Sequence, residues 1–117
     1  MSKEVANNSG LAYNSLTAGS VIIGNLTSEN DCRIDGEVQG DIQCKGKLVV
    51  GKTGKLKGTI LCENAEVSGD ILGNIVVSDT LTLRANSVFT GDIKTQILII
   101  EPNAVLNGTC SMKNDKE

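Results

Sequence analysis

The sequence predicts an all-β fold, a single β-helix of about six coils, and three observations lead to this prediction. The 117-residue chain is rich in glycine and poor in aromatic residues, with 13 Gly and 2% Phe, Trp and Tyr together. A five-residue motif centred on glycine recurs along the chain, and a second apolar motif lies between its copies. The length is that of one domain.

The composition favours strands over helices. With so few aromatic residues, the core must consist of small aliphatic side chains, each of which contributes about 1.5–3 kcal/mol when fully buried. Glycine costs about 1 kcal/mol relative to alanine inside a helix, so 13 glycines indicate strands joined by bends. The net charge of −3 argues against nucleic-acid binding, which normally requires a strongly basic domain.

The first motif has the form apolar, any, Gly, any, apolar. Its glycines are separated by 16, 18, 15, 18 and 17 residues, a spacing typical of a solenoid. The six copies are Ile22–Leu26, Val38–Ile42, Leu56–Ile60, Ile71–Ile75, Phe89–Ile93 and Leu106–Cys110.

The second motif, small or apolar, any, apolar, alternates with the first. Its copies are Cys32–Ile34, Leu48–Val50, Ala65–Val67, Leu81–Leu83 and Ile97–Ile99, with Leu16–Ala18 as an opening copy. A third column of small or medium-sized residues follows each glycine motif: Ser28, Cys44, Cys62, Val77, Thr95 and Met112.

The spacing inside each motif sets which side chains share a face. Residues two apart in a strand point to the same side, so we expect the apolar and glycine positions to face inward. The positions directly after each glycine are then outward, and these are all polar: Asn25, Asp41, Thr59, Asn74, Asp92 and Thr109. We expect the inward glycines to leave room for side chains of the opposing walls of a narrow coil.

With these motifs in view, the chain resembles the bactofilins. The resemblance rests on Ile34–Ile42 (IDGEVQGDI), Leu48–Gly51 and the closing Ala104–Cys110, and it extends from Leu16 to Met112. It implies a bacterial cytoskeletal protein with a right-handed β-helix of triangular section at 15–112, between flexible tails at 1–14 and 113–117. It also implies assembly without nucleotide, through the terminal coils, into non-polar filaments at the membrane or near cell-wall or motility proteins.

The ends of such a solenoid are the candidate functional surfaces. A β-helix without caps leaves strand edges and apolar side chains exposed at both ends, and self-association would cover them. The candidate polymerisation residues are Leu16, Ile22 and Leu26 on the first coil, and Ile97, Ile99 and Leu106 on the last. The family commonly has Phe at the position of Leu106. The candidate membrane contacts are Leu11 and Tyr13 in the N-terminal tail.

Three local patterns suggest other chemistry. Residues 46–53 match the phosphate-binding pattern G-x-x-x-x-G-K-[ST], but that loop requires a helix after it, and here another glycine motif follows. Cys44 and Cys62 share a column on neighbouring coils, which allows either a disulfide or two packed thiols; a cytoplasmic address favours thiols. The lysines at 45, 47, 52, 55 and 57 form either a solvated face or a surface for an acidic partner or anionic lipid.

Other function classes fit less well. The chain has no His, the base on which hexapeptide-repeat acyltransferases depend, and it lacks the long loops that form the substrate cleft of β-helical lyases. No apolar run reaches the ~18–20 residues of a membrane span, and the first ten residues do not resemble a signal peptide, so a cytoplasmic location is expected. We therefore expect no enzymatic activity, cofactor, metal or nucleotide. The alternative to a filament is a non-polymerising scaffold that binds proteins through its flat faces.

Overall fold

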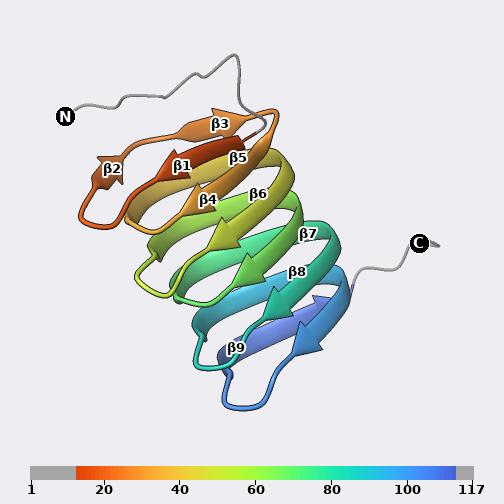
Figure 1. Ribbon diagram of the computed structural model, residues 1–117. Coiled ribbons are helices and arrows are strands. Elements are labelled where there is room, and N and C mark those ends of the chain that lie inside the picture. The colour runs from red at the N-terminus through yellow and green to blue at the C-terminus, as the bar shows by residue number, and fades with distance from the viewer. Residues whose placement is uncertain (1–12, 113–117) are drawn as a thin grey trace.

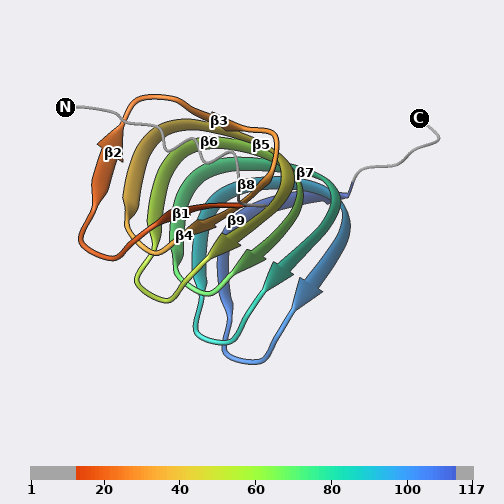
Figure 2. The ribbon, with the colours of Figure 1, turned by 45° about the horizontal axis from the view of Figure 1, so that its top comes forward.

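The structure, a computed structural model, describes residues 13–112. The regular elements in this range are nine strands, which form one parallel sheet wound into a solenoid of about six turns. Figures 1 and 2 show the turns stacked along one axis and winding in a right-handed sense from the N-terminus to the C-terminus. The predicted fold class is confirmed.

The strands increase in length after the first coil. The first four are short: β1 (Tyr13–Leu16), β2 (Val21–Ile23), β3 (Leu26–Ser28) and β4 (Asp31–Ile34). The next four each bend through two corners: β5 (Glu37–Val50), β6 (Lys55–Val67), β7 (Asp70–Leu83) and β8 (Val88–Ile100). The last strand is β9 (Val105–Met112).

Each turn of the solenoid has three faces. The first face comprises residues 13–16, 31–34, 47–50, 64–67, 80–83 and 97–100. The second comprises 21–23, 37–39, 55–57, 70–72, 88–90 and 105–107. The third comprises 26–28, 42–44, 60–62, 75–77, 93–95 and 110–112.

The register of these faces confirms the predicted columns, except in the first coil and on the first face of the last coil, where Leu98 pairs with Leu81. Ser28, Cys44, Cys62, Val77, Thr95 and Met112 lie beside one another in order, as expected. Leu16 lies beside Ile34, so the opening copy of the second motif ends at Leu16 instead of beginning there. The first turn is longer than the predicted repeat, and counting back 16 residues from Cys32 therefore gave the wrong phase.

Aliphatic side chains fill the interior, alternating with outward residues along every strand. The core consists of 19 buried residues, and the one phenylalanine, Phe89, is completely buried among them. Phe89 lies beside Ile71 in the preceding coil and beside Leu106 in the following coil. Leu106 thus covers the largest core side chain and is itself only partly buried, because no coil follows it within residues 13–112.

The glycine column has a different cause from the one expected. From Gly40 to Gly108 its glycines adopt φ values between +135° and +140°, a region that L side chains rarely adopt. A Cβ at Gly73 would overlap the carbonyl oxygen of Gly58 in the preceding coil, and the other glycines of the column after Gly24 stack in the same way. The glycines therefore permit a sharp corner and close backbone stacking. They do not make room for side chains of the opposing walls, as the sequence-based interpretation assumed.

A second column of small residues lies at the end of each turn between the first and second faces. It consists of Ser20, Gly36, Gly54, Gly69, Ser87 and Ala104, and the carbonyl groups of the first five accept backbone hydrogen bonds from the following coil. Ser87 is fully buried, and its hydroxyl has no hydrogen-bond partner. A buried hydroxyl without a partner costs about 1–3 kcal/mol.

Ser87→Ala is therefore expected to stabilise the fold by about 1 kcal/mol, because it removes this unsatisfied group. Alanine already occupies the equivalent position of the next coil at Ala104. Thermal unfolding checks the prediction, with Ser20→Ala as the matched control. The Ser20 hydroxyl lies 3.3 Å from the Thr17 hydroxyl in a hydrogen bond, so its removal should bring no gain. Equal effects of the two changes would contradict this explanation.

Candidate functional site

The N-terminal end of the solenoid is formed by β1, β2 and β3. Among the described residues, these strands pair on one side only, with β4 and β5, so their other edges carry unpaired backbone groups. Leu16, Ile22 and Leu26 point inward and pack against the N-terminal end of the core, but each remains partly exposed. This end therefore presents both free strand edges and the upper surface of the apolar core.

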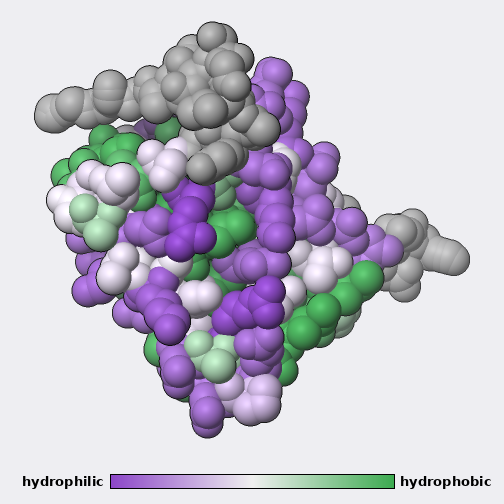
Figure 3. Space-filling model, viewed as in Figure 1, coloured by the Kyte–Doolittle hydropathy of each residue, from purple (hydrophilic) through white to green (hydrophobic). Residues whose placement is uncertain are grey.

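The C-terminal end is formed by residues 97–100 of β8 and by β9. Leu98, Leu106 and Cys110 point inward and are partly buried against the core, while Ile100 remains 47% exposed. Figure 3 shows hydrophobic side chains gathered along this end, over the last part of β8. Both ends of the described chain thus combine free edges with apolar side chains.

The register places Ile97 and Ile99 differently from the prediction. Leu98 and Ile100 continue the inward columns of Leu81 and Leu83, so the predicted phase was wrong by one residue in this coil. Ile97 and Ile99 point outward on the first face, with 45% and 47% of their surface exposed. They border the end surface instead of forming its centre.

The error has an identifiable source. All four residues from Ile97 to Ile100 are aliphatic, so alternation between polar and apolar positions gives no phase. A different signal would have found it, because in every earlier coil the last inward residue of the first face comes directly before the turn, as in Val50–Gly51 and Leu83–Arg84. By that rule Ile100, directly before Glu101, is the inward residue.

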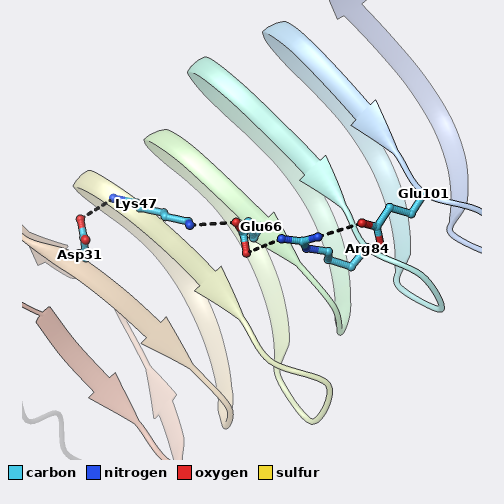
Figure 4. Close-up of polar contacts among 5 residues, drawn as sticks. All are labelled: Asp31, Lys47, Glu66, Arg84 and Glu101. Carbon is cyan, nitrogen blue, oxygen red and sulfur yellow. Dashed lines mark hydrogen bonds and ion pairs between the residues drawn. The ribbon is translucent and has the colours of Figure 1, made fainter.

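A ladder of charged side chains crosses five coils along the first face (Figure 4). It consists of Asp31, Lys47, Glu66, Arg84 and Glu101. The Lys47 backbone N–H donates to Asp31 Oδ1 at 2.8 Å, and Lys47 Nζ lies 2.8 Å from Glu66 Oε2. Arg84 lies 3.2 Å from Glu66 and 2.8 Å from Glu101, which also accepts a 2.9 Å bond from the Ala85 N–H. The ladder ties neighbouring coils together along the solenoid axis.

The charge ladder predicts a dependence of stability on pH. Hydrogen bonds from Lys47 and then Arg84 hold the pKa of Glu66 below its ordinary value, and the Ala85 N–H and Arg84 do the same for Glu101. A carboxylate with a lowered pKa in the folded state stabilises the fold above its unfolded pKa and loses this effect as the pH falls through the folded value. We therefore expect the melting temperature to fall as the pH drops below about 4.3, the ordinary glutamate value. Glu66→Gln should melt with a shallower acid dependence; an unchanged dependence would contradict the role of Glu66.

The apparent phosphate-binding pattern at 46–53 has a structural explanation. Residues 46–50 belong to strand β5, and strand β6 follows the pattern in place of a helix. A side chain at Gly46 would overlap the Asp31 carboxylate, and one at Gly51 would overlap the Asp35 carboxylate. The two glycines therefore accommodate acidic side chains from the preceding coil, and the Thr53 hydroxyl donates to the Asp35 carbonyl at 2.7 Å.

Three cysteines gather at one corner as free thiols. Cys44 lies beside Cys62 on the neighbouring coil and donates to the Asn30 carbonyl at 3.2 Å. A hydrogen bond with the Cys32 thiol, together with burial, raises the pKa of Cys44, and burial raises the pKa of Cys62 to about 12. Because the thiolate is the reactive form, these thiols are poor nucleophiles and behave as core residues.

The five lysines at 45–57 do not form one patch. Lys47 belongs to the charge ladder on the first face, and Lys52 lies in the turn that follows. Lys55 and Lys57 point outward from the second face, and Lys45 lies between the third face and the first face of the next coil. A single basic surface for anionic lipid, one of the two interpretations of this stretch, is therefore not present.

No group of three or more His, Cys, Asp or Glu side chains among residues 13–112 is arranged to hold a metal ion. The same part of the chain contains no helix long and apolar enough to cross a membrane. Leu11, one of the two predicted membrane contacts, lies outside the described residues, and for Tyr13 only the backbone, in β1, is described.

Comparison with known proteins agrees with this geometry. The family described as "Bactofilin: Polymer-forming cytoskeletal" matches residues 14–111. The chain belongs to the bactofilin family. Two bactofilins of Myxococcus xanthus (strain DK1622) are similar to it. BacO is 33% identical over 103 residues, which cover 87% of this chain and 82% of BacO. BacP is 31% identical over 100 residues, which cover 85% of this chain and 42% of BacP.

A solved bactofilin structure is also similar. It is the cytoskeletal bactofilin BacA, determined by solid-state NMR, with a TM-score of 0.81 and 33% identity over 89% of this chain and 99% of BacA. The resemblance inferred from the sequence is thus confirmed, and with it the assignment to a polymer-forming cytoskeletal family.

Proposed function

We propose that this chain is a structural subunit that assembles end to end, without nucleotide, into filaments. One observation supports the proposal most directly: in the described part of the chain, both end coils carry strand edges without a partner around partly exposed core side chains. Unpaired edges favour addition of another strand, and burial of apolar surface drives the association. Polymerisation covers both ends of every subunit except those at the filament tips.

Both end surfaces consist mainly of aliphatic side chains. Leu16, Ile22 and Leu26 form the contact surface of the first coil. Leu106 is the centre of the surface on the last coil, because it lies over Phe89, and Ile100 and Cys110 complete it. Ile97 and Ile99 point outward at the rim of the contact between two subunits, which we call the joint.

We further infer that like ends meet. A contact between like ends has two-fold symmetry, so alternating first-coil and last-coil joints produce a filament without polarity. Cys110 offers a test, because the other three cysteines are only 3% exposed and the first coil contains no cysteine. A joint between two last coils brings two copies of Cys110 into one interface, whereas a head-to-tail joint brings Cys110 against the first coil.

A bismaleimide cross-linker of short reach distinguishes these arrangements. Like-end joints should produce covalent dimers on a denaturing gel. Products larger than a dimer should not form, because each chain has one accessible thiol. Burial raises the pKa of Cys110, so the reaction is best run at mildly alkaline pH. Cys110→Ser is the control. Filaments that yield no covalent dimer would argue for head-to-tail joints.

Pelleting assays test the proposed polymer itself. Sedimentation of a concentration series, with and without added nucleotide and magnesium, should show the same critical concentration under both conditions. A requirement for nucleotide would contradict the proposal and return attention to residues 46–53.

The wider role follows from the polymer. We propose a cytoplasmic filament, peripheral to the inner face of the cell membrane, that serves as a scaffold for cell-shape, cell-wall or motility proteins and has no enzymatic activity. A non-polymerising scaffold that binds proteins through its flat faces is the second candidate. It is favoured by Leu61 and Leu72, which point outward in the middle of the chain and are 45% and 50% exposed. A monomer whose mass is independent of concentration would favour this second candidate.

A further inference from the structure

The second face of the solenoid carries a hollow. This hollow has a volume of ≈ 260 Å³ and is lined by outward residues of three coils, Lys55 and Lys57, Asp70 and Leu72, and Val88 and Thr90, with Leu56 and Ile71 beneath. The ion pairs of the described residues lie on the first face and its turns, so the charges of Lys55, Lys57 and Asp70 remain available to a partner. We call this surface the groove face.

The outward residues of the groove face form two columns along the axis. The first column reads Val21, Glu37, Lys55, Asp70, Val88 and Val105, and the second reads Ile23, Gln39, Lys57, Leu72, Thr90 and Asn107. Valines therefore occupy both ends of the first column, and Ile23 and Asn107 occupy the ends of the second. Two acids and two lysines lie between these ends. This arrangement is neutral overall and has opposite charges on either side of its middle.

We propose that the groove face pairs with the groove face of a second copy running in the opposite direction, and so joins two filaments side by side. A two-fold axis along the strands places the first coil of one copy opposite the last coil of the other. The second coil then faces the fifth, and the third faces the fourth. Lys55 then faces Asp70 of the second copy, and Asp70 faces Lys55 of that copy. Lys55 of each copy thus enters the hollow of the other copy, beside Asp70.

The same operation matches the apolar ends of the first column and places Ile23 opposite Asn107 in the second. Val21 faces Val105 of the second copy, and these side chains are 57% and 42% exposed in the single chain. Leu72, at 50% exposed, faces the alkyl stem of Lys57. Gln39 faces Thr90, and Glu37, which faces Val88, keeps its 2.9 Å hydrogen bond from the Gln39 amide.

Pairing in the same direction is disfavoured by charge. A two-fold axis parallel to the filament brings each coil opposite itself and the first column opposite the second. Lys55 then faces Lys57 in both copies, so four lysines meet in the middle of the contact. Like charges in direct opposition are destabilising, which selects the antiparallel arrangement.

The size of the face explains why a polymer is needed. Six coils at about 4.8 Å and three residues at about 3.3 Å give roughly 290 Å² per copy. A stable protein–protein interface buries about 800 Å² per partner, so two isolated subunits should not pair. Subunits linked in a filament make many such contacts at once, and weak contacts then add up to strong association. Many contacts form at once only if the groove faces of successive subunits lie on the same side of the filament. This holds when the two-fold axis of each end joint is perpendicular to the groove face.

Charge exchange tests the proposal, which rests on the proposed filament. Lys55→Glu and Asp70→Lys should each reduce the fraction of paired filaments in negative-stain images at least fivefold, because each places like charges opposite one another. The double variant Lys55→Glu with Asp70→Lys should regain the wild-type fraction. Lys94→Glu makes the same charge change on the third face and should have no effect.

High-speed pelleting of the same samples separates the two levels of assembly. All four variants should retain the wild-type amount of polymer, and circular dichroism should show unchanged folding. Wild-type filaments that remain single, or single-site variants that pair normally, would overturn lateral pairing and leave the filament proposal intact. Failure of the double variant to restore pairs would also overturn it. Absence of any wild-type polymer would overturn both proposals.

Discussion

Leu106→Arg is expected to convert long polymers into discrete dimers. Leu106 lies over Phe89 at the centre of the last coil, so each joint between two last coils would bury two arginines facing one another. Loss of a central apolar contact typically costs at least 2 kcal/mol, and two repelling charges add to this, which lowers the joint affinity by about 100-fold. Joints between first coils are untouched, so pairs of subunits should remain. Analytical ultracentrifugation measures the result.

The matched control is Ser111→Arg. Ser111 is exposed on the outward side of the same coil, so this change adds the same charge without placing it in the joint. Its polymers should be normal. The fold of the Leu106→Arg variant should also be retained, because residue 106 is at the end of the core and a long side chain there can extend its charge into solvent. Monomers in place of dimers would argue for head-to-tail joints, and undiminished polymers would refute the role of the last coil.

Gly73→Ala is expected to abolish or severely weaken folding. Gly73 has φ +137°, and an added Cβ would overlap the backbone oxygen of Gly58. The strain of this backbone conformation alone costs about 1–3 kcal/mol. The overlap is with backbone on a neighbouring strand, so two coils would have to separate, and the total approaches the ~5–15 kcal/mol by which a typical domain is stable. Circular dichroism and thermal melting measure the effect.

Gly24→Ala separates the two contributions. Gly24 has nearly the same φ, +135°, but a Cβ there has nothing within 4 Å because no described coil precedes it. This variant should lose only the strain contribution and remain folded. If the two substitutions had equal effects, backbone stacking would not be the reason for glycine in this column.

Much of the fold was predictable because the solenoid repeats one local rule. Alternation around Val38 and Ile42 defined the inward face, and the same spacing in later coils defined the register. The reason for the glycines was not predictable in the same way. The sequence places glycine every coil, but a positive φ and stacked backbones are properties of the three-dimensional corner.

The charge ladder and the groove face illustrate what the sequence does not reveal. Asp31 and Lys47 lie in the same outward column, directly before the paired Cys32 and Leu48, but Glu66 lies in another outward column and Arg84 in the turn. Only long side chains that lean along the axis bring these groups together, and no column of the sequence contains them all. The groove face likewise depends on which polar residues of a column oppose each other after a two-fold rotation.

Negative-stain electron microscopy of the purified chain without nucleotide is the simplest test of whether this bactofilin polymerises by itself. We expect filaments that form above a critical concentration and that look the same when nucleotide and magnesium are added. Small particles at every concentration, under both conditions, would rule out self-assembly and favour a scaffold that acts through its flat faces.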